Sequence, residues 1–389
     1  MSDQQTDTQT SSNNKSQQRK KGLSIFILLL LLISIGSAAY WYLFIKGFEE
    51  TEDAYVSGNQ VMVSAQVAGN ISKINVDNMD PVQAGDVLLE LDDTNAKLSF
   101  EQAKSNLANA VRQVSQLNYT VKQLKSAVRA NEITLAQAQG NLNRRVQLVK
   151  DGAIDKESFQ HAKEAVELAK ANLTTSQNQL GANQALLLDG PLSEQPQIQS
   201  AVSNLKQAWL NLERTKIRSP IKGYVARRNA QVGQAVSVGG ALMAVVTTDQ
   251  MWLDANFKET QLTHMRIGQP VEIHFDLYGK DKTFNGKVVG IEMGTGSAFS
   301  LLPAQNATGN WIKVVQRVPV RIQLDPQQLA ENPLRIGLSA TVKVNVSDSK
   351  GETLRDQAPA TTLYSTNVLQ YDESAVNNLI ESIIRDNSY

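Results

Sequence analysis

The chain has 389 residues, of which 41% are hydrophobic, and it balances 38 basic against 38 acidic side chains. A net charge of zero argues against a protein that binds nucleic acid over its surface. The absence of cysteine excludes a disulfide framework and a lipid-attached lipoprotein anchor. This length leaves room for two or three compact modules.

The N-terminal part divides into a polar tail and an apolar run. Residues 1–21 lack any apolar stretch, which predicts a disordered tail. A basic cluster at 19–21 then precedes Leu23–Ile45, a run of 23 residues without a charge. About 20 apolar residues cross the core of a bilayer, and basic flanks stay in the cytoplasm. Residues 22–46 are therefore expected to form a single-pass transmembrane anchor with a cytoplasmic N-terminus.

The same run also contains a candidate cleavage site for a signal peptide. Ser37-Ala38-Ala39 supplies small residues at a suitable spacing. The apolar stretch continues through Tyr40–Ile45, however, and its aromatic residues suit the outer interface of a retained helix. We therefore expect a retained anchor, with a cleaved signal peptide as the alternative.

A weak internal repeat links two segments that lie far apart in the sequence. Residues 64–93 align without a gap on residues 218–247, at a constant offset of 154, which brings Gly69 onto Gly223. Both segments read as short alternating apolar strands with glycine turns. Because a few short strands are marginal in water by themselves, we expect the two halves to close on each other.

The two halves resemble those of the lipoyl/biotinyl carrier fold. The resemblance implies a split β-module built from residues 47–93, which include a lead-in, and residues 216–248. Carrier domains present a modified lysine on the turn between their halves. Here a long insert fills that position, and neither Lys97 nor Lys216 has the neighbours of such a lysine. No cofactor is therefore expected.

The insert at residues 94–215 carries the spacing of a coiled coil. Its first seam alternates steps of four and three residues, with polar residues only at Asn131 and Arg145. The seam consists of Ala96, Phe100, Ala103, Leu107, Ala110, Val114, Leu117, Val121, Leu124, Val128, Asn131, Leu135, Ala138, Leu142, Arg145 and Val149. Heptads sustained over this length predict a long coiled-coil helix.

A second seam follows a break at Asp151-Gly152, after which Asp155 and Ser158 form a helix N-cap signal. It consists of Phe159, Ala162, Val166, Ala169, Leu173, Ser176, Leu180, Asn183 and Leu187, and resumes after an interruption with Ile198, Val202, Leu205, Trp209 and Leu212. The two seams predict an antiparallel hairpin with Gly152 at its tip. A helical bundle with its own core is the alternative, although no third long helix is present.

The last part of the chain changes to short strands separated by turns. The expected strands are Trp252–Phe257, Pro270–Phe275, Gly286–Glu292, Trp311–Val315, Val318–Leu324 and Ala340–Val346. Their spacing predicts a small β-barrel over residues 249–346. Residues 347–389 are polar except for an amphipathic stretch around Leu379, which predicts a flexible extension that ends in a short helix.

No known catalytic motif occurs in the sequence. The histidines, His161, His264 and His274, lack the spacing of a metal site, and no nucleophile motif is present. The outward helix carries nine basic and two acidic residues without interleaved aromatics, which favours a solvated or partner-facing stripe. We therefore expect no enzyme, no metal site and no nucleic-acid partner.

Together, the anchor, the split module, the hairpin and the barrel resemble the HlyD-type membrane fusion proteins, or periplasmic adaptors. Residues 215–246 are similar to the signature of that group, and Asp254–Gln261 and Gly294–Trp311 look like its EmrA branch. The resemblance covers about residues 20–346. It implies an α+β multidomain fold with an N-terminal transmembrane helix, a lipoyl/biotinyl-like β-module, a coiled-coil hairpin and a small β-barrel.

This resemblance also implies a function, that of the adaptor subunit in a tripartite multidrug efflux pump. Its partners would be an inner-membrane major-facilitator drug/proton antiporter of the EmrB kind and an outer-membrane channel of the TolC kind. The adaptor would form a homo-oligomer, with its anchor in the inner membrane and its bulk in the periplasm. An adaptor that serves an ABC transporter in type 1 protein or peptide secretion shares the architecture and is the alternative.

Adaptors that dock onto such channels often carry three marked residues at the hairpin tip. These are an arginine, a leucine four residues later and a serine seven residues beyond it. Here the positions hold Arg144, Leu148 and Asp155, so aspartate replaces serine. The resemblance implies channel docking through these residues with a variant contact at Asp155, whose carboxylate also suits helix capping.

Overall fold

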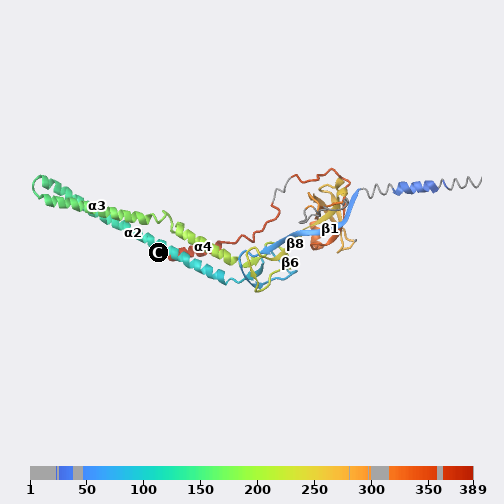
Figure 1. Cartoon of the computed structure of the whole chain (residues 1–389), viewed down its shortest axis with the longest axis horizontal. Coiled ribbons are helices and arrows are strands. Elements are labelled where there is room, and N and C mark those ends of the chain that lie inside the picture. Colours follow the sequence, from blue (N-terminus) through green and yellow to red (C-terminus); the bar gives the residue numbers. More distant parts are fainter. Residues whose placement is uncertain are drawn as a thin grey trace, which may run out of the picture. The chain divides into compact units, whose positions relative to one another are not determined.

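The structure of the protein is a computed structural model that describes residues 23, 26–37, 47–279, 281–296, 298, 315–356 and 362–388. The chain forms two compact units, both drawn in Figure 1. One unit contains residues 1–60 and 246–365, and the other contains residues 61–245 and 366–389. The chain therefore passes between the units three times.

A closed β-barrel occupies the first unit. Its strands are β1 (Phe48–Ser64), β8 (Ala241–Lys258), β9 (Pro270–Phe275), β10 (Phe284–Ile291), β11 (Arg317–Leu324) and β12 (Ser339–Asn345), with η3 (Glu259–His264) and α5 (Pro326–Glu331) between strands. They pair in the order β1-β12-β9-β10-β11-β8, and β8 pairs back with β1. The predicted barrel is confirmed, although the strand expected at Trp311–Val315 lies, apart from its last residue, outside the described residues.

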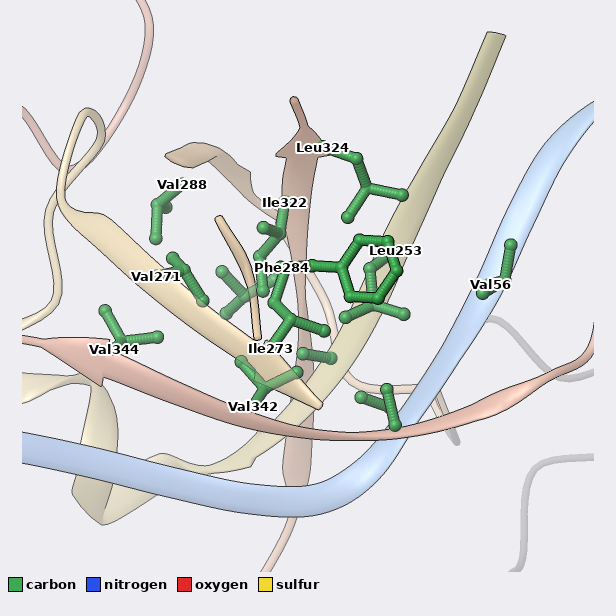
Figure 2. Close-up of a cluster of buried hydrophobic side chains, with 14 of the residues drawn as sticks. Val56, Leu253, Val271, Ile273, Phe284, Val288, Ile322, Leu324, Val342 and Val344 are labelled. Atoms are coloured by element: carbon green, nitrogen blue, oxygen red, sulfur yellow. The ribbon is translucent and has the colours of Figure 1, made fainter. Parts of the chain in front are cut away.

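Alternating side chains fill this barrel. On β9, Val271, Ile273 and Phe275 are buried, and the residues between them are more exposed, which is the period of two that a strand imposes. Phe275 packs edge-on against Phe284, with 4.8 Å between the ring centroids. Figure 2 shows side chains from several strands, including Leu253, converging on this cluster.

The repeat of the sequence forms one small β-module in the second unit. Its strands are β2 (Gly69–Ile74), β3 (Pro81–Val82), β4 (Val87–Leu91), β5 (Lys216–Arg218), β6 (Gly223–Arg228) and β7 (Ala235–Val236), joined by the adjoining ends of β1 and β8. β2 and β6, and likewise β3 and β7, are related by the same offset of 154 residues. Their pairing is reciprocal, because Gly69 opposes Val236 while Gly223 opposes Val82. The two halves close on each other with approximate twofold symmetry.

One turn of this module differs between the two halves. Gly233 has a φ of +82°, and its N–H donates to the carbonyl of Ile71 at 2.8 Å. At the equivalent position Met79 has a φ of +74°, and its N–H donates to the carbonyl of Val225 at 2.8 Å. A left-handed conformation costs a non-glycine residue about 1–3 kcal/mol. The symmetry of the module therefore imposes strain on Met79.

The insert in the second unit is the predicted helical hairpin. α2 (Thr94–Lys150) has 57 residues and is about 85 Å long at 1.5 Å per residue. α3 (Lys156–Gln184) and α4 (Pro196–Glu213) return along it, as Figure 1 shows, with the short η2 (Leu192–Glu194) between them. Every apolar residue of both predicted seams is buried or partly buried, whereas Arg145 is exposed. The heptad register is confirmed.

A polar pair crosses the seam near the middle of the hairpin. The amide nitrogen of Asn131 donates to the hydroxyl oxygen of Ser176 at 2.6 Å, and both residues occupy predicted seam positions on opposite helices. A polar residue in a coiled-coil seam finds its partner in one register only. This bond therefore helps to fix how α3 lies along α2.

The return helix is interrupted between α3 and α4, and Gln195 organises the break. The buried side chain of Gln195 donates to the carbonyl of Leu188 at 2.8 Å and accepts from its N–H at 3.0 Å. Pro196 then occupies the start of α4, where its missing N–H has no helical partner to lose. The interruption absorbs the surplus residues of the return helix.

The C-terminal segment contains the predicted short helix, which packs against the hairpin. α6 (Ser374–Asn387) packs against α2 and α4, as Figure 1 shows near the C-terminus, and buries Val376 and Ile380. Val111, which lies off the predicted seam, is fully buried at the same place. The predicted short helix is therefore present as α6, but its docking was not expected, because the apolar face that the two-helix seam leaves uncovered at the hairpin base cannot be read from the composition of the tail.

The predicted anchor at residues 22–46 and the tail at residues 1–21 lie largely outside the described residues. Residues 26–37 are helical. Within the described part of the chain, no helix combines the length and the apolar character that crossing a membrane requires. The anchor therefore stays a prediction.

Candidate functional site at the hairpin tip

A glycine in the left-handed backbone conformation ends α2 and separates it from α3. Gly152 has a φ of +68°, and its N–H donates to the carbonyl of Val149 at 3.1 Å. The N–H of Ala153 donates to the carbonyl of Leu148 at 2.9 Å. This pair of bonds is the Schellman motif, which satisfies the last carbonyls of a helix. The break predicted at Asp151-Gly152 is therefore the turn at the hairpin tip.

Asp155 caps the start of α3, as its sequence context predicts. One carboxylate oxygen accepts from the N–H of Ser158 at 2.6 Å, and the other accepts from the hydroxyl of Ser158 at 3.1 Å. These bonds, the backbone one first, hold the pKa of the Asp155 carboxyl below its ordinary value. The side chain is also exposed, so the capping carboxylate faces solvent at the tip.

Arg144 and Leu148 lie one helical turn apart near the end of α2. Arg144 is exposed, and its guanidinium bonds to the side chain of Asn141 one turn earlier. Leu148 is 42% exposed, a large fraction for a leucine. Residues four apart share one face of a helix. The tip therefore presents a cation and an apolar side chain together, and neither residue belongs to the seam.

The neighbouring Arg145 has a different place. Its guanidinium donates to the carbonyl of Ser158 at 3.4 Å, so it connects the last turns of α2 to the first turn of α3. In the sequence, Arg145 stands out only as a polar break in the seam. Its seam position and its long side chain are the signals that could have indicated a contact across the tip.

Charged groups of both signs surround these residues. Lys150 and Lys156 flank the turn, and on α3 His161 lies 3.6 Å from Glu157 and 3.7 Å from Glu164. Among the described residues, no group of three or more His, Asp or Glu side chains is arranged to hold a metal ion. Arg144, Leu148 and Asp155 are thus exposed together around the turn at the tip.

Comparison with known proteins finds a match for the hairpin and for the barrel and two similar relatives. The model described as EMRA, alpha-helical hairpin domain, matches residues 94–215, and the AAEA-like beta-barrel domain matches residues 250–345. The chain is 78% identical to the Multidrug export protein EmrA of Haemophilus influenzae and 50% identical to that of Escherichia coli, each over 355 residues and 91% of both chains. A solved structure of the periplasmic adaptor protein EmrA matches 77% of this chain and 98% of its own, with 19% identity and a TM-score of 0.41. On the sequence matches, the chain belongs to the EmrA-like membrane fusion proteins.

Proposed function

We propose that this chain is the periplasmic adaptor subunit of a tripartite multidrug efflux pump. It links an inner-membrane major-facilitator drug/proton antiporter of the EmrB kind to an outer-membrane channel of the TolC kind. The main support is the 78% identity, over 91% of the chain, to a relative named for multidrug export. The exposed tip of a long hairpin supports the same function, because it offers a place for the channel to dock.

The hairpin serves as a spacer with a docking end. α2 alone is about 85 Å long, and the seam packs along its full length. The tip therefore stands far from the β-module within the same unit. We infer that Arg144, Leu148 and Asp155 contact the channel there, the arginine through charge and the leucine through its exposed apolar surface.

The remaining modules assemble the conduit in this proposal. The reciprocal pairing of β2 with β7 and of β3 with β6 supports a lipoyl-like module split between residues 47–93 and 216–248. The hairpin fills residues 94–215, and the barrel fills residues 249–346. Copies of the chain then pack side by side as a homo-oligomer around the path of the drug.

The N-terminal run holds the adaptor beside its pump. The uncharged run at Leu23–Ile45 and the basic cluster at 19–21 support an anchor at residues 22–46, a cytoplasmic tail and a periplasmic bulk. The adaptor performs no catalysis in this scheme and needs no cofactor, because the antiporter supplies the energy. Its contribution is the geometry of the conduit.

Affinity purification from native membranes tests the partners. A tagged chain, cross-linked briefly before extraction, should recover a major-facilitator transporter together with an outer-membrane channel. A matched variant with residues 22–46 replaced by a cleavable signal peptide should recover less of the transporter while it keeps its own fold. Recovery of an ABC transporter in place of the antiporter would contradict the proposal and establish a secretion adaptor.

A further inference from the structure

The hairpin joins the β-module through two chain connections that lie side by side. β4 leads into α2 through Asp92 and Asp93, and α4 leads into β5 through residues 214–215. The N–H of Leu91 donates to the carbonyl of Thr215 at 2.9 Å, which ties one connection to the other. Two adjacent connections define an axis. The hairpin can tilt about that axis unless a third contact away from it holds the angle.

The two connections form the joint between the hairpin and the β-module. The C-terminal segment contacts the β-module on one side of this joint. The hydroxyl of Thr366 donates to the carbonyl of Pro220 at 2.6 Å. The hydroxyl of Tyr371 donates to the amide oxygen of Gln66 at 3.4 Å. Because Gln66 belongs to the first half of the repeat and Pro220 to the second, the segment contacts both halves of the module.

The same segment contacts the hairpin on the other side of the joint. The ammonium of Lys206 lies 2.8 Å from the carboxylate of Glu373. The ring of Tyr371 meets the ring of Trp209 edge-on, with 6.3 Å between their centroids. Tyr371 therefore bridges the joint by itself, through its hydroxyl to the module and through its ring to α4.

α6 anchors the end of the segment on the hairpin base. Val376 and Ile380 are 2% and 6% exposed, and they join a cluster that contains Leu107, Ile198 and Leu205, each fully buried. α6 has only 14 residues. Isolated helices of about 12–15 residues are marginal in water, so the stability of α6 depends on this docking.

A hollow lies beside the middle of the segment. A cavity of about 520 Å³ lies between α4 and residues 369–373. Arg214 lines this cavity, and its buried Nε has no hydrogen-bond partner among the described residues. The segment is thus held by a few discrete side-chain contacts around a hollow and by the docked α6 at its end, which are the properties of a strap rather than of a core element.

We propose that residues 366–388, here called the strap, fix the angle between the hairpin and the β-module, and that undocking of α6 frees the hairpin to tilt. The strap begins at Thr366, where the chain re-enters the second unit after the first unit, which contains the barrel. The strap thus gives the chain a means to control where its hairpin tip points. This inference does not depend on which channel the tip meets.

Distance measurement between two spin labels tests this role of the strap. The chain has no cysteine, so Lys73→Cys on β2 and Gln123→Cys on α2 create unique, exposed labelling sites. The releasing variant is Val376→Asp with Ile380→Asp. Its matched control is Ser374→Asp with Asn378→Asp, which adds the same charge at exposed positions of α6. Amide exchange reports separately whether α6 is docked.

In the releasing variant, α6 should lose amide protection by about tenfold or more, and the distance distribution should broaden by about twofold. The control should keep a narrow distribution and a protected α6. A narrow distribution around an unprotected α6 would overturn the proposal. A protected α6 in the releasing variant would also overturn it, because Val376 and Ile380 would then not hold the strap.

A charge exchange at the middle of the strap gives an independent check that keeps the core intact. Glu373→Lys places two cations together at Lys206 and should broaden the distribution without unfolding α6. The double variant Glu373→Lys with Lys206→Glu restores opposite charges and should narrow the distance distribution again. An equal width in the single and double variants would show that this contact does not position the hairpin.

Discussion

The two ends of the hairpin are built differently, although one helix runs through both. At the base, residues 94–118 pack with α4 and α6, and Leu107, Val111, Ile198 and Leu205 are fully buried. In the distal half, residues 119–187 form only two helices. There the buried apolar residues are Val128, Ala162, Val166 and Ala169, all small or medium in size. Three helices enclose a core, whereas two helices share only a seam.

This difference assigns separate tasks to the two ends. The base holds the fold, because apolar burial is the main favourable term in folding. The distal half buries little, so most of its side chains are available for contact with a partner. Substitutions in the core should therefore affect stability at the base far more than at the tip.

The largest expected effect is a cavity at the base. Leu107→Ala should cost about 3–4 kcal/mol of unfolding free energy, because Leu107 is fully buried between three helices. Leu142→Ala, on the same seam in the distal half, should cost about 1 kcal/mol, because Leu142 is only partly buried. Urea unfolding followed by circular dichroism measures both. Equal costs would show that the two ends do not differ.

A charge in the distal seam should have a smaller but clear effect. Leu124→Asp places an unpaired carboxylate in the helix interface and should cost about 2–3 kcal/mol. Gln123→Asp adds the same charge one residue away at an exposed position and should be nearly neutral. Thermal unfolding of the two variants decides this. Equal losses of helicity in the two variants would contradict the assignment of Leu124 to the helix interface.

The hydrogen bond between Asn131 and Ser176 in the distal seam should contribute less to stability than Leu124 does. A double-mutant cycle with Asn131→Ala and Ser176→Ala should give a coupling of about 1 kcal/mol, because the two side chains share one hydrogen bond. A coupling near zero would mean that the bond does not help to set the register. Asn183→Ala provides a control, since its side chain bonds within its own helix.

The smallest effect belongs to the cap at the tip, and it depends on pH. The folded-state pKa of Asp155 is lowered, so its contribution is complete above the ordinary aspartate pKa of about 4 and is lost as the pH falls through the lower value. The protection of the amides in the first turn of α3, relative to their intrinsic exchange rates, should therefore fall as the pH is lowered through that range. Asp155→Asn caps without titrating, so it should remove this pH dependence. An unchanged profile in the variant would exclude Asp155 as its source.

Much of this architecture could be predicted from the sequence because it follows from periodicity. Every apolar residue that the heptads place in the seams is buried or partly buried, and the repeat offset of 154 relates β2 to β6 and β3 to β7. The docking of α6 could not be predicted, because it depends on a surface that exists only after α2 and α4 have packed. The contact of Arg145 with Ser158 likewise requires the geometry of the folded turn.

The tip illustrates a different limit. Its turn and the cap at Asp155 were predicted from local signals, since both involve residues close in sequence. The docking role proposed for Arg144 and Leu148 rests on resemblance, because exposure shows that a side chain is available and does not identify its partner. Only a functional measurement can connect these side chains to a channel.

The most direct test is drug resistance in a strain that depends on this pump. The double variant Arg144→Asp with Leu148→Asp should lose resistance, because it reverses a charge and removes an apolar contact at the tip without touching the seam. Protein level, membrane anchoring and association with the transporter should stay normal, and Asp155→Ser should keep resistance because serine also caps helices. Full resistance in the double variant would contradict docking of the hairpin tip onto an outer-membrane channel.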